Sequence, residues 1–145
     1  MRPGAPATDT AAAFLAAIED GDAQTVWECF STSARRFVVE RGVRRGLSPE
    51  AGASILDGTA TEHFHRQFIE DVLAGLRKDL ELVRIFLVEV APPSPLDDHR
   101  VRVVCLERFD VPVGPPLEPL PVGSIDLVSE DGVWRVERLI PRPGG

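Results

Sequence analysis

Three carboxylates could face the apolar interior of a sheet predicted for the second half of the chain. Glu89, Glu107 and Asp126 each alternate with aliphatic residues, which places them on apolar strand faces. An acid in apolar surroundings has its pKa raised toward the range used in general acid–base catalysis. The alternative is that each acid lies at a strand end or pairs with an arginine, because buried carboxylates are uncommon and usually paired. The nearest candidate partners are Arg102, Arg108 and Arg138.

A histidine on the longest predicted helix could work with these acids. His65 flanks the apolar stripe of that helix one turn before Ile69, whereas His63 points toward the polar side. Imidazole transfers protons near neutral pH, so His65 with Glu107 or Asp126 is the catalytic set that the pattern suggests. The alternative is that His65 is a boundary residue on the helix surface.

Neither a metal site nor an activated nucleophile is indicated. His63 and His65 are two residues apart, and on a helix such residues point in different directions, so one metal ion cannot easily take both. Cys29 and Cys105 both have apolar neighbours and are expected to be reduced, buried and inert. The sequence contains no Gly-x-Ser-x-Gly motif and no glycine-rich phosphate loop. We therefore expect no metal and no cofactor.

Length and composition indicate one small soluble domain. The 145 residues are 43% hydrophobic and 27% charged, which suffices for a single core over residues 1–145, with flexible tails at 1–7 and 141–145. A net charge of −7 argues against nucleic acid and acidic membranes as partners. No apolar run reaches the ~20 residues of a membrane span. The first residues do not resemble a secretory signal, so we expect a cytoplasmic protein.

Helix signals dominate the first 30 residues. Gly21 suits the residue after a helix, and Asp22 suits the N-cap of the next helix, so two short helices are expected to meet there. Farther along, Phe37–Val39 reads as a short strand. Five arginines between Arg35 and Arg45 form a basic segment, which is either a solvated strand edge or a site for an anionic partner.

Two further helices are expected before residue 81. Ser48 and Pro49 fit the N-cap and first position of a short helix that ends at Asp57-Gly58. Thr59 and Glu62 match a capping box and open the longest helix, about Ala60 to Leu80.

Beyond residue 81 the hydrophobic period changes from that of a helix to that of a strand. Asp131-Gly132 is a strong signal for a tight hairpin between the last two strands. No helical pattern separates the strands, so they should pair antiparallel and give an α+β fold. The predicted strands are Leu82–Val90, Val101–Phe109, Val122–Val128 and Val133–Ile140.

The opening segment Phe14–Asp22 with Val26-Trp27, and the closing hairpin Glu130–Val136, resemble the nuclear transport factor 2-like superfamily. The resemblance implies N-terminal helices packed in the concave face of a strongly curved, cone-shaped antiparallel sheet. It also implies a pocket between that face and the long helix, and a homodimer formed through the outer face. Relatives include ketosteroid isomerase and polyketide cyclase-like proteins. The chain has no Tyr and no Asn, so no catalytic motif of these relatives can be transferred.

The leading functional expectation is a domain that binds a small apolar or weakly polar ligand. Trp27, Phe68, Cys105 and Glu89 are the expected ligand-binding residues. One alternative is a cofactor-independent isomerase, cyclase or hydrolase that uses His65, Glu107 and Asp126. Another is an interaction domain that uses the Arg35–Arg45 segment. Strands with apolar residues on both faces also favour a homodimer. The proline-rich segment Pro112–Pro121 is expected to be a rigid connection or a stiff lid beside the pocket, and a polyproline II ligand is the alternative.

Overall fold

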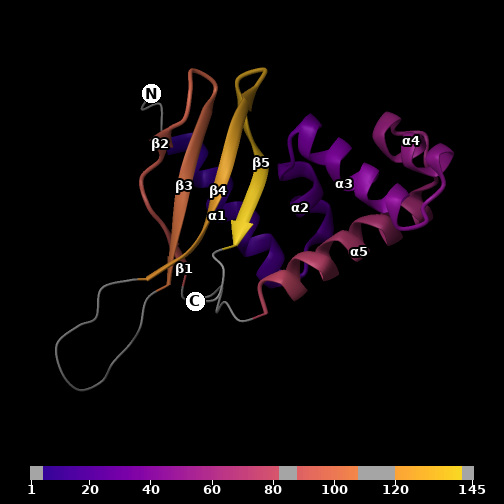
Figure 1. Ribbon diagram of the computed structural model, residues 1–145, viewed down its shortest axis with the longest axis horizontal. Helices are drawn as coiled ribbons and strands as arrows, with labels where there is room; N and C mark the ends of the chain where they lie inside the picture. Colours follow the sequence, from indigo (N-terminus) through magenta and orange to yellow (C-terminus); the bar gives the residue numbers. More distant parts are fainter. Residues whose placement is uncertain (1–4, 82–87, 108–119, 142–145) are drawn as a thin grey trace.

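The computed structural model describes residues 5–81, 88–107 and 120–141. Figure 1 shows helices in the first half of the chain and an antiparallel sheet in the second half, so the expected α+β class is confirmed. The helices are α1 (Ala5–Asp20), α2 (Ala23–Cys29), α3 (Thr32–Arg44), α4 (Pro49–Asp57) and α5 (Glu62–Asp79). The strands are β1 (Val88–Val90), β2 (Ser94–Pro95), β3 (Arg100–Glu107), β4 (Leu120–Glu130) and β5 (Val133–Pro141).

The junction of α1 and α2 forms as predicted. Gly21 takes a positive φ of 78°, which a residue without Cβ adopts at no steric cost. Asp22 then caps α2 by accepting a hydrogen bond from the Thr25 amide. The end of α1 is also fixed from outside, because the guanidinium of Arg77 in α5 donates to the carbonyls of Ile18 and Glu19 at 2.8 and 2.7 Å.

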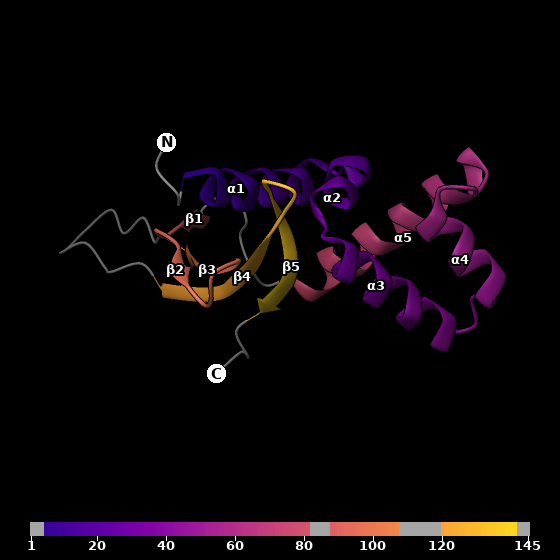
Figure 2. The same cartoon turned by 90° about the horizontal axis from the view of Figure 1, so that it is seen from above.

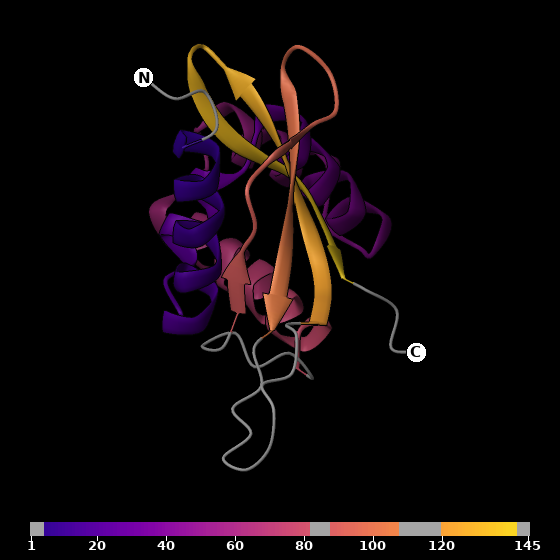
Figure 3. The same cartoon turned by 90° about the vertical axis from the view of Figure 1, so that its left-hand side faces the viewer.

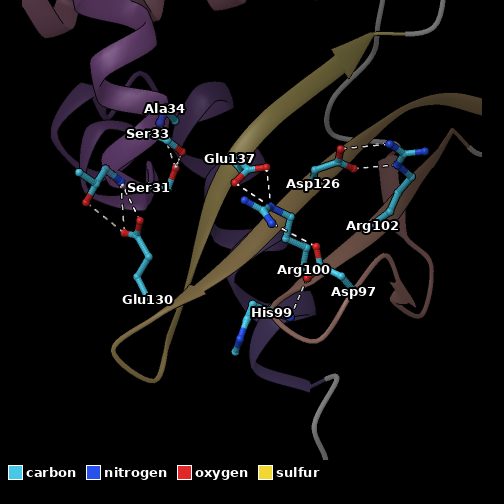
Figure 4. Close-up of polar contacts among 11 residues, drawn as sticks. Ser31, Ser33, Ala34, Asp97, His99, Arg100, Arg102, Asp126, Glu130 and Glu137 are labelled. Atoms are coloured by element: carbon cyan, nitrogen blue, oxygen red, sulfur yellow. Dashed lines mark hydrogen bonds and ion pairs between the residues drawn. The ribbon is translucent and has the colours of Figure 1, made fainter.

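The strand predicted at Phe37–Val39 is wrong, because these residues lie within α3. Ser31 caps this helix by accepting from the Ala34 amide at 3.0 Å, and the Glu130 carboxylate accepts from the Thr32 amide at 3.1 Å (Figure 4). The Ser31 amide also donates to the Val136 carbonyl of β5 at 2.8 Å. These bonds start the helix and outweigh the strand propensity of one Phe-Val-Val run.

Helices α4 and α5 differ in how well their starts were predicted. Ser48 caps α4 with Pro49 in its first turn, and Gly58 ends the helix at φ 80°, as expected. The capping box at Thr59 is wrong, since the N-cap of α5 is Thr61, whose side chain accepts from the Phe64 amide. The Thr59 amide donates instead to the Asp57 carboxylate at 2.9 Å.

The sheet has the order β1-β3-β4-β5, with the short β2 pairing to β3, and these strands pair antiparallel. Asp131 and Gly132 both take positive φ, 52° and 79°, as the predicted type I′ hairpin requires. Strands β3, β4 and β5 pair with their neighbours in chain order and antiparallel, as the predicted meander requires. Strand β2 was not predicted. Residues 82–87 and 108–109 of two predicted strands, and residues 112–119 of the proline-rich segment, lie outside the described residues.

Helix α1, and not the longest helix, covers one face of the sheet (Figures 2 and 3). Phe14 and Ile18 of α1 are completely buried together with Val103, Ile125 and Leu127 of the sheet. Helix α5 packs chiefly on α2, and α3, α4 and the start of α5 extend beyond β5 (Figure 1). The expectation that the long helix lies across a pocket from this sheet face is therefore wrong, because α1 occupies that face.

Both ends of the described chain belong to regular elements, α1 and β5. Helix α1 already begins at Ala5, and Ala7 is completely buried, within the tail expected for residues 1–7. At the other end β5 runs to Pro141, and residues 1–4 and 142–145 lie outside the described residues.

Among the described helices, none combines the length and apolar character needed to cross a membrane.

Candidate functional site

A surface groove of about 380 Å³ runs between α1 and the edge strand β1. Two small residues of α1, Ala12 and Ala16, leave room for it, and both are exposed on the helix. The exposed carboxylates of Glu19 and Glu89 border the groove, while its other walls are apolar. The full lining is Ala12, Leu15, Ala16, Glu19, Val88, Glu89 and Val90.

An apolar cavity lies farther in, between α1, the end of α5 and the inner face of the sheet. It is small, about 20 Å³, which is room for about one water molecule. Leu15 and Val88 line both this cavity and the surface groove, so the two spaces adjoin. The long helix contributes only its C-cap, Leu80. The cavity is lined by Leu15, Leu80, Val88, Cys105, Val122, Gly123, Leu139 and Pro141.

Cys105, one of the expected ligand-binding residues, lies in the wall of the inner cavity. Burial raises the pKa of its thiol to about 11, because the charged thiolate is poorly solvated there. The thiol is therefore protonated near neutral pH and behaves as a small apolar group. Cys29 is half-buried, and burial raises the pKa of its thiol as well.

Two of the predicted carboxylates lie near this region. Glu107 is buried on β3, two residues beyond Cys105 on the same strand face, and its register partner on β1 is Val88. Glu89, on the opposite side of β1 from Val88, is exposed and borders the groove. Glu107 lies on the same buried side of β3 as Val103 and Cys105, which is the side that the alternation predicted.

The third carboxylate, Asp126, lies on the outer face of the sheet, although it was expected to point inward. Its register partner is Arg102, whose guanidinium binds it through two contacts, Nε–Oδ1 at 2.7 Å and Nη2–Oδ2 at 3.1 Å (Figure 4). This pairing is the alternative that the sequence analysis left open. A bulge opposite Cys105/Leu106 adds one residue to β4, so Val122 lines the inner cavity while Asp126 faces outward.

Trp27, His65 and Phe68 form an aromatic cluster between α2 and α5, away from the inner cavity. The Trp27 ring meets the rings of His65 and Phe68 edge to face, with centroids 6.1 and 5.8 Å apart. Arg35 stacks over the same indole, with Cζ 5.3 Å from the ring centroid. Neither Trp27 nor Phe68 lines the groove or the inner cavity.

His65 lines a separate cleft of about 260 Å³ between the α1–α2 turn and α5. That cleft contains Arg66, which forms an exposed ion pair with Glu62 at 2.9 Å. Neither Glu107 nor Asp126 is among its walls, so the proposed acid–base set is not brought together. In the described part of the chain, no group of three or more His, Cys, Asp or Glu residues is placed to hold a metal ion.

The sequence analysis missed Leu15 and Val88, which join the two spaces. It assigned the pocket to the long helix, so the sheet-facing side of α1 was treated as core alone. The available signal was the pair Ala12 and Ala16, four residues apart and therefore on one side of the helix, where small side chains leave space beside a strand.

Comparison of the chain with protein-family models, with curated proteins and with solved structures finds no match.

Proposed function

We propose that the protein binds a small apolar or weakly polar ligand between α1 and the sheet. The observation that carries this proposal is the common wall, Leu15 and Val88, between a groove of about 380 Å³ and an apolar inner cavity. Ligand pockets in proteins are usually several hundred Å³ in volume, with mostly apolar walls and a few polar groups. The groove meets both conditions, and the inner cavity extends it toward Cys105.

The two ends of the site favour different parts of a ligand. The described walls of the inner end are apolar, with the neutral thiol of Cys105 among them. The outer end is bordered by Glu19 and Glu89, and no cationic side chain is among the described walls of the groove. The site therefore suits a ligand with an apolar body directed inward and a hydrogen-bond donor or positive charge at the groove mouth.

A pair of substitutions on α1 tests the proposal without disturbing the core. Ala16 and Ala13 are both exposed on this helix, but only Ala16 lines the groove. Ala16→Phe should fill the groove and weaken the binding of the neutral apolar dye Nile red by at least about tenfold. Ala13→Phe adds the same ring outside the groove and should leave dye affinity unchanged. Equal affinity for the dye in both variants would contradict the proposal.

We also propose membership of the nuclear transport factor 2-like superfamily, with its cone-shaped sheet. Support comes from the order of helices before strands, from α1 on one sheet face, and from the tight closing hairpin.

The homodimer of the same proposal would use the outer face of the sheet. Val104 and Leu106 are half-buried there, beside the Arg102–Asp126 pair. Sedimentation that shows a monomer at roughly tens of micromolar would contradict the dimer.

A further inference from the structure

The arginines of the described residues separate into two groups. The first group is engaged in the fold: Arg35 and Arg135 donate to backbone carbonyls of α2, Arg77 does so to α1, and others form ion pairs with carboxylates. The second group makes no hydrogen bond or ion pair with any described residue, and all but one of its members lie on α3 or at its C-cap. That group is Arg36, Arg41, Arg44, Arg45 and Arg138.

Helical spacing gathers these cations around an exposed aromatic ring. Arg36 precedes Phe37, and Arg41 and Arg44 follow it by four and seven residues, which places them along one side of the helix. Phe37 is 57% exposed, an unusual state for so large an apolar side chain. We call Arg36, Phe37, Arg41, Arg44 and Arg45 the cationic face of α3.

The opposite side of α3 is held firmly, so the cationic face is presented in one orientation. Arg35 donates to the Trp27 carbonyl at 3.0 Å and stacks on the Trp27 ring. Val39 is buried against α4, where a Cβ on Gly52 would come within 2.8 Å of Val39 Cγ1. A surface that is already ordered loses little conformational entropy when a partner binds.

We propose that the cationic face of α3 docks an acidic segment of a partner protein that also carries an apolar side chain for Phe37. Charge complementarity favours this occupant: four exposed arginines outnumber the one exposed carboxylate among them, Glu40, and so form a positive patch on a chain whose net charge is −7. That net charge opposes a long nucleic acid or an anionic bilayer, which would meet more of the surface than α3. Protein interfaces are enriched in Phe and Arg side chains. The phosphate backbone of a nucleic acid would contact the arginines but would offer no apolar contact for the Phe37 ring.

The test uses two synthetic fluorescent peptides of equal negative charge. One is a helix-forming peptide with Glu at most positions and Leu on one side, and the other has Gln in place of each Leu. The full-length protein should bind the Leu peptide with a dissociation constant of about micromolar, and the Gln peptide at least about tenfold more weakly. Raising NaCl from about 50 to about 500 mM should weaken binding, since exposed charges are screened.

Three variants locate the interaction. The double variant Arg41→Glu with Arg44→Glu should weaken binding of the Leu peptide at least about tenfold, and Phe37→Ala should remove its advantage over the Gln peptide. Arg138→Glu is the matched control, because Arg138 is exposed and unpaired but lies on β5. All positions are exposed, and circular dichroism would verify that the variants are folded.

Four outcomes would overturn the proposal. The first is equal binding by wild type and the double variant, and the second is equal loss of affinity in Arg138→Glu. The third is tight binding of phosphatidylglycerol vesicles or duplex DNA without peptide binding, which would assign the face to a membrane or a nucleic acid. The fourth is concentration-dependent self-association abolished by the double variant, which would assign the face to a second copy of this chain.

Discussion

Leu15 of α1 and Val88 of β1 line both the surface groove and the inner cavity, so these two side chains separate the two spaces. A rotation of either side chain would enlarge the inner cavity from room for about one water molecule toward room for a ligand. Because β1 lies at the edge of the sheet and, among the described strands, pairs with β3 alone, it is the part of the wall best able to move.

Two glycines on helices predict opposite changes in stability. In Gly52→Ala the new methyl carbon would meet Val39 Cγ1 at 2.8 Å and Val43 Cγ2 at 3.2 Å, which should lower the free energy of unfolding by about 1–3 kcal/mol. At Gly75 nothing lies within 4 Å, so Gly75→Ala should raise stability by about 0.5–1 kcal/mol through helix propensity. Urea denaturation measures both, and an equal response would show that α3 and α4 do not pack this closely.

The serine caps of α3 and α4 differ in their surroundings. Ser31 is completely buried and caps α3, whereas the exposed Ser48 makes the same type of bond to the Ala51 amide. Ser48→Ala should cost about 1 kcal/mol, and Ser31→Ala should cost about 2 kcal/mol because the amide of Ala34 is then left buried and unpaired. Thermal unfolding of the two variants checks this order, and a larger loss for Ser48→Ala would contradict it.

The buried thiol of Cys105 predicts a loss of stability in mild alkali. Its pKa is raised from 9.0 to about 11 in the folded state. The unfolded chain therefore loses this proton first as the pH rises, so the stabilising contribution is complete below pH 9 and declines between about pH 9 and pH 11. At about pH 10 the loss should be about 1 kcal/mol.

The chain suits this measurement, because it contains no Tyr and a single Lys. Urea midpoints at about pH 7 and about pH 10 should differ less for Cys105→Ala than for wild type. The Cys29→Ala variant, which keeps the Cys105 thiol, should retain the Cys105 part of the difference. Unchanged pH dependence in Cys105→Ala would show that another group causes the loss.

Local signals predicted the parts of the fold that depend on a few neighbouring residues. Gly21-Asp22, Ser48-Pro49 and Asp131-Gly132 all act where the sequence placed them, because a cap or a tight turn is decided by its own backbone geometry. The strand alternation of β3 was equally reliable, and it placed Cys105 and Glu107 on the buried face.

Features that depend on distant residues were not predictable in the same way. The helix through Phe37 begins at Ser31, which is bonded to Val136 more than a hundred residues later. Val122 and Asp126 lie on different sides of β4 because a bulge at Val122 interrupts the alternation, and alternation alone does not reveal a bulge. His65 lies beside Trp27 and not near the sheet, because α5 packs on α2.

The location of a bound apolar probe tests the central proposal most directly. Protein labelled with ¹³C at the methyl groups of Leu, Val and Ile would be titrated with Nile red and followed by two-dimensional NMR. The account predicts the largest shifts at Leu15, Val88 and Leu139, whose methyl groups line the proposed site. Shifts concentrated at Val43 and Ile55, in the helices beyond β5, would contradict it.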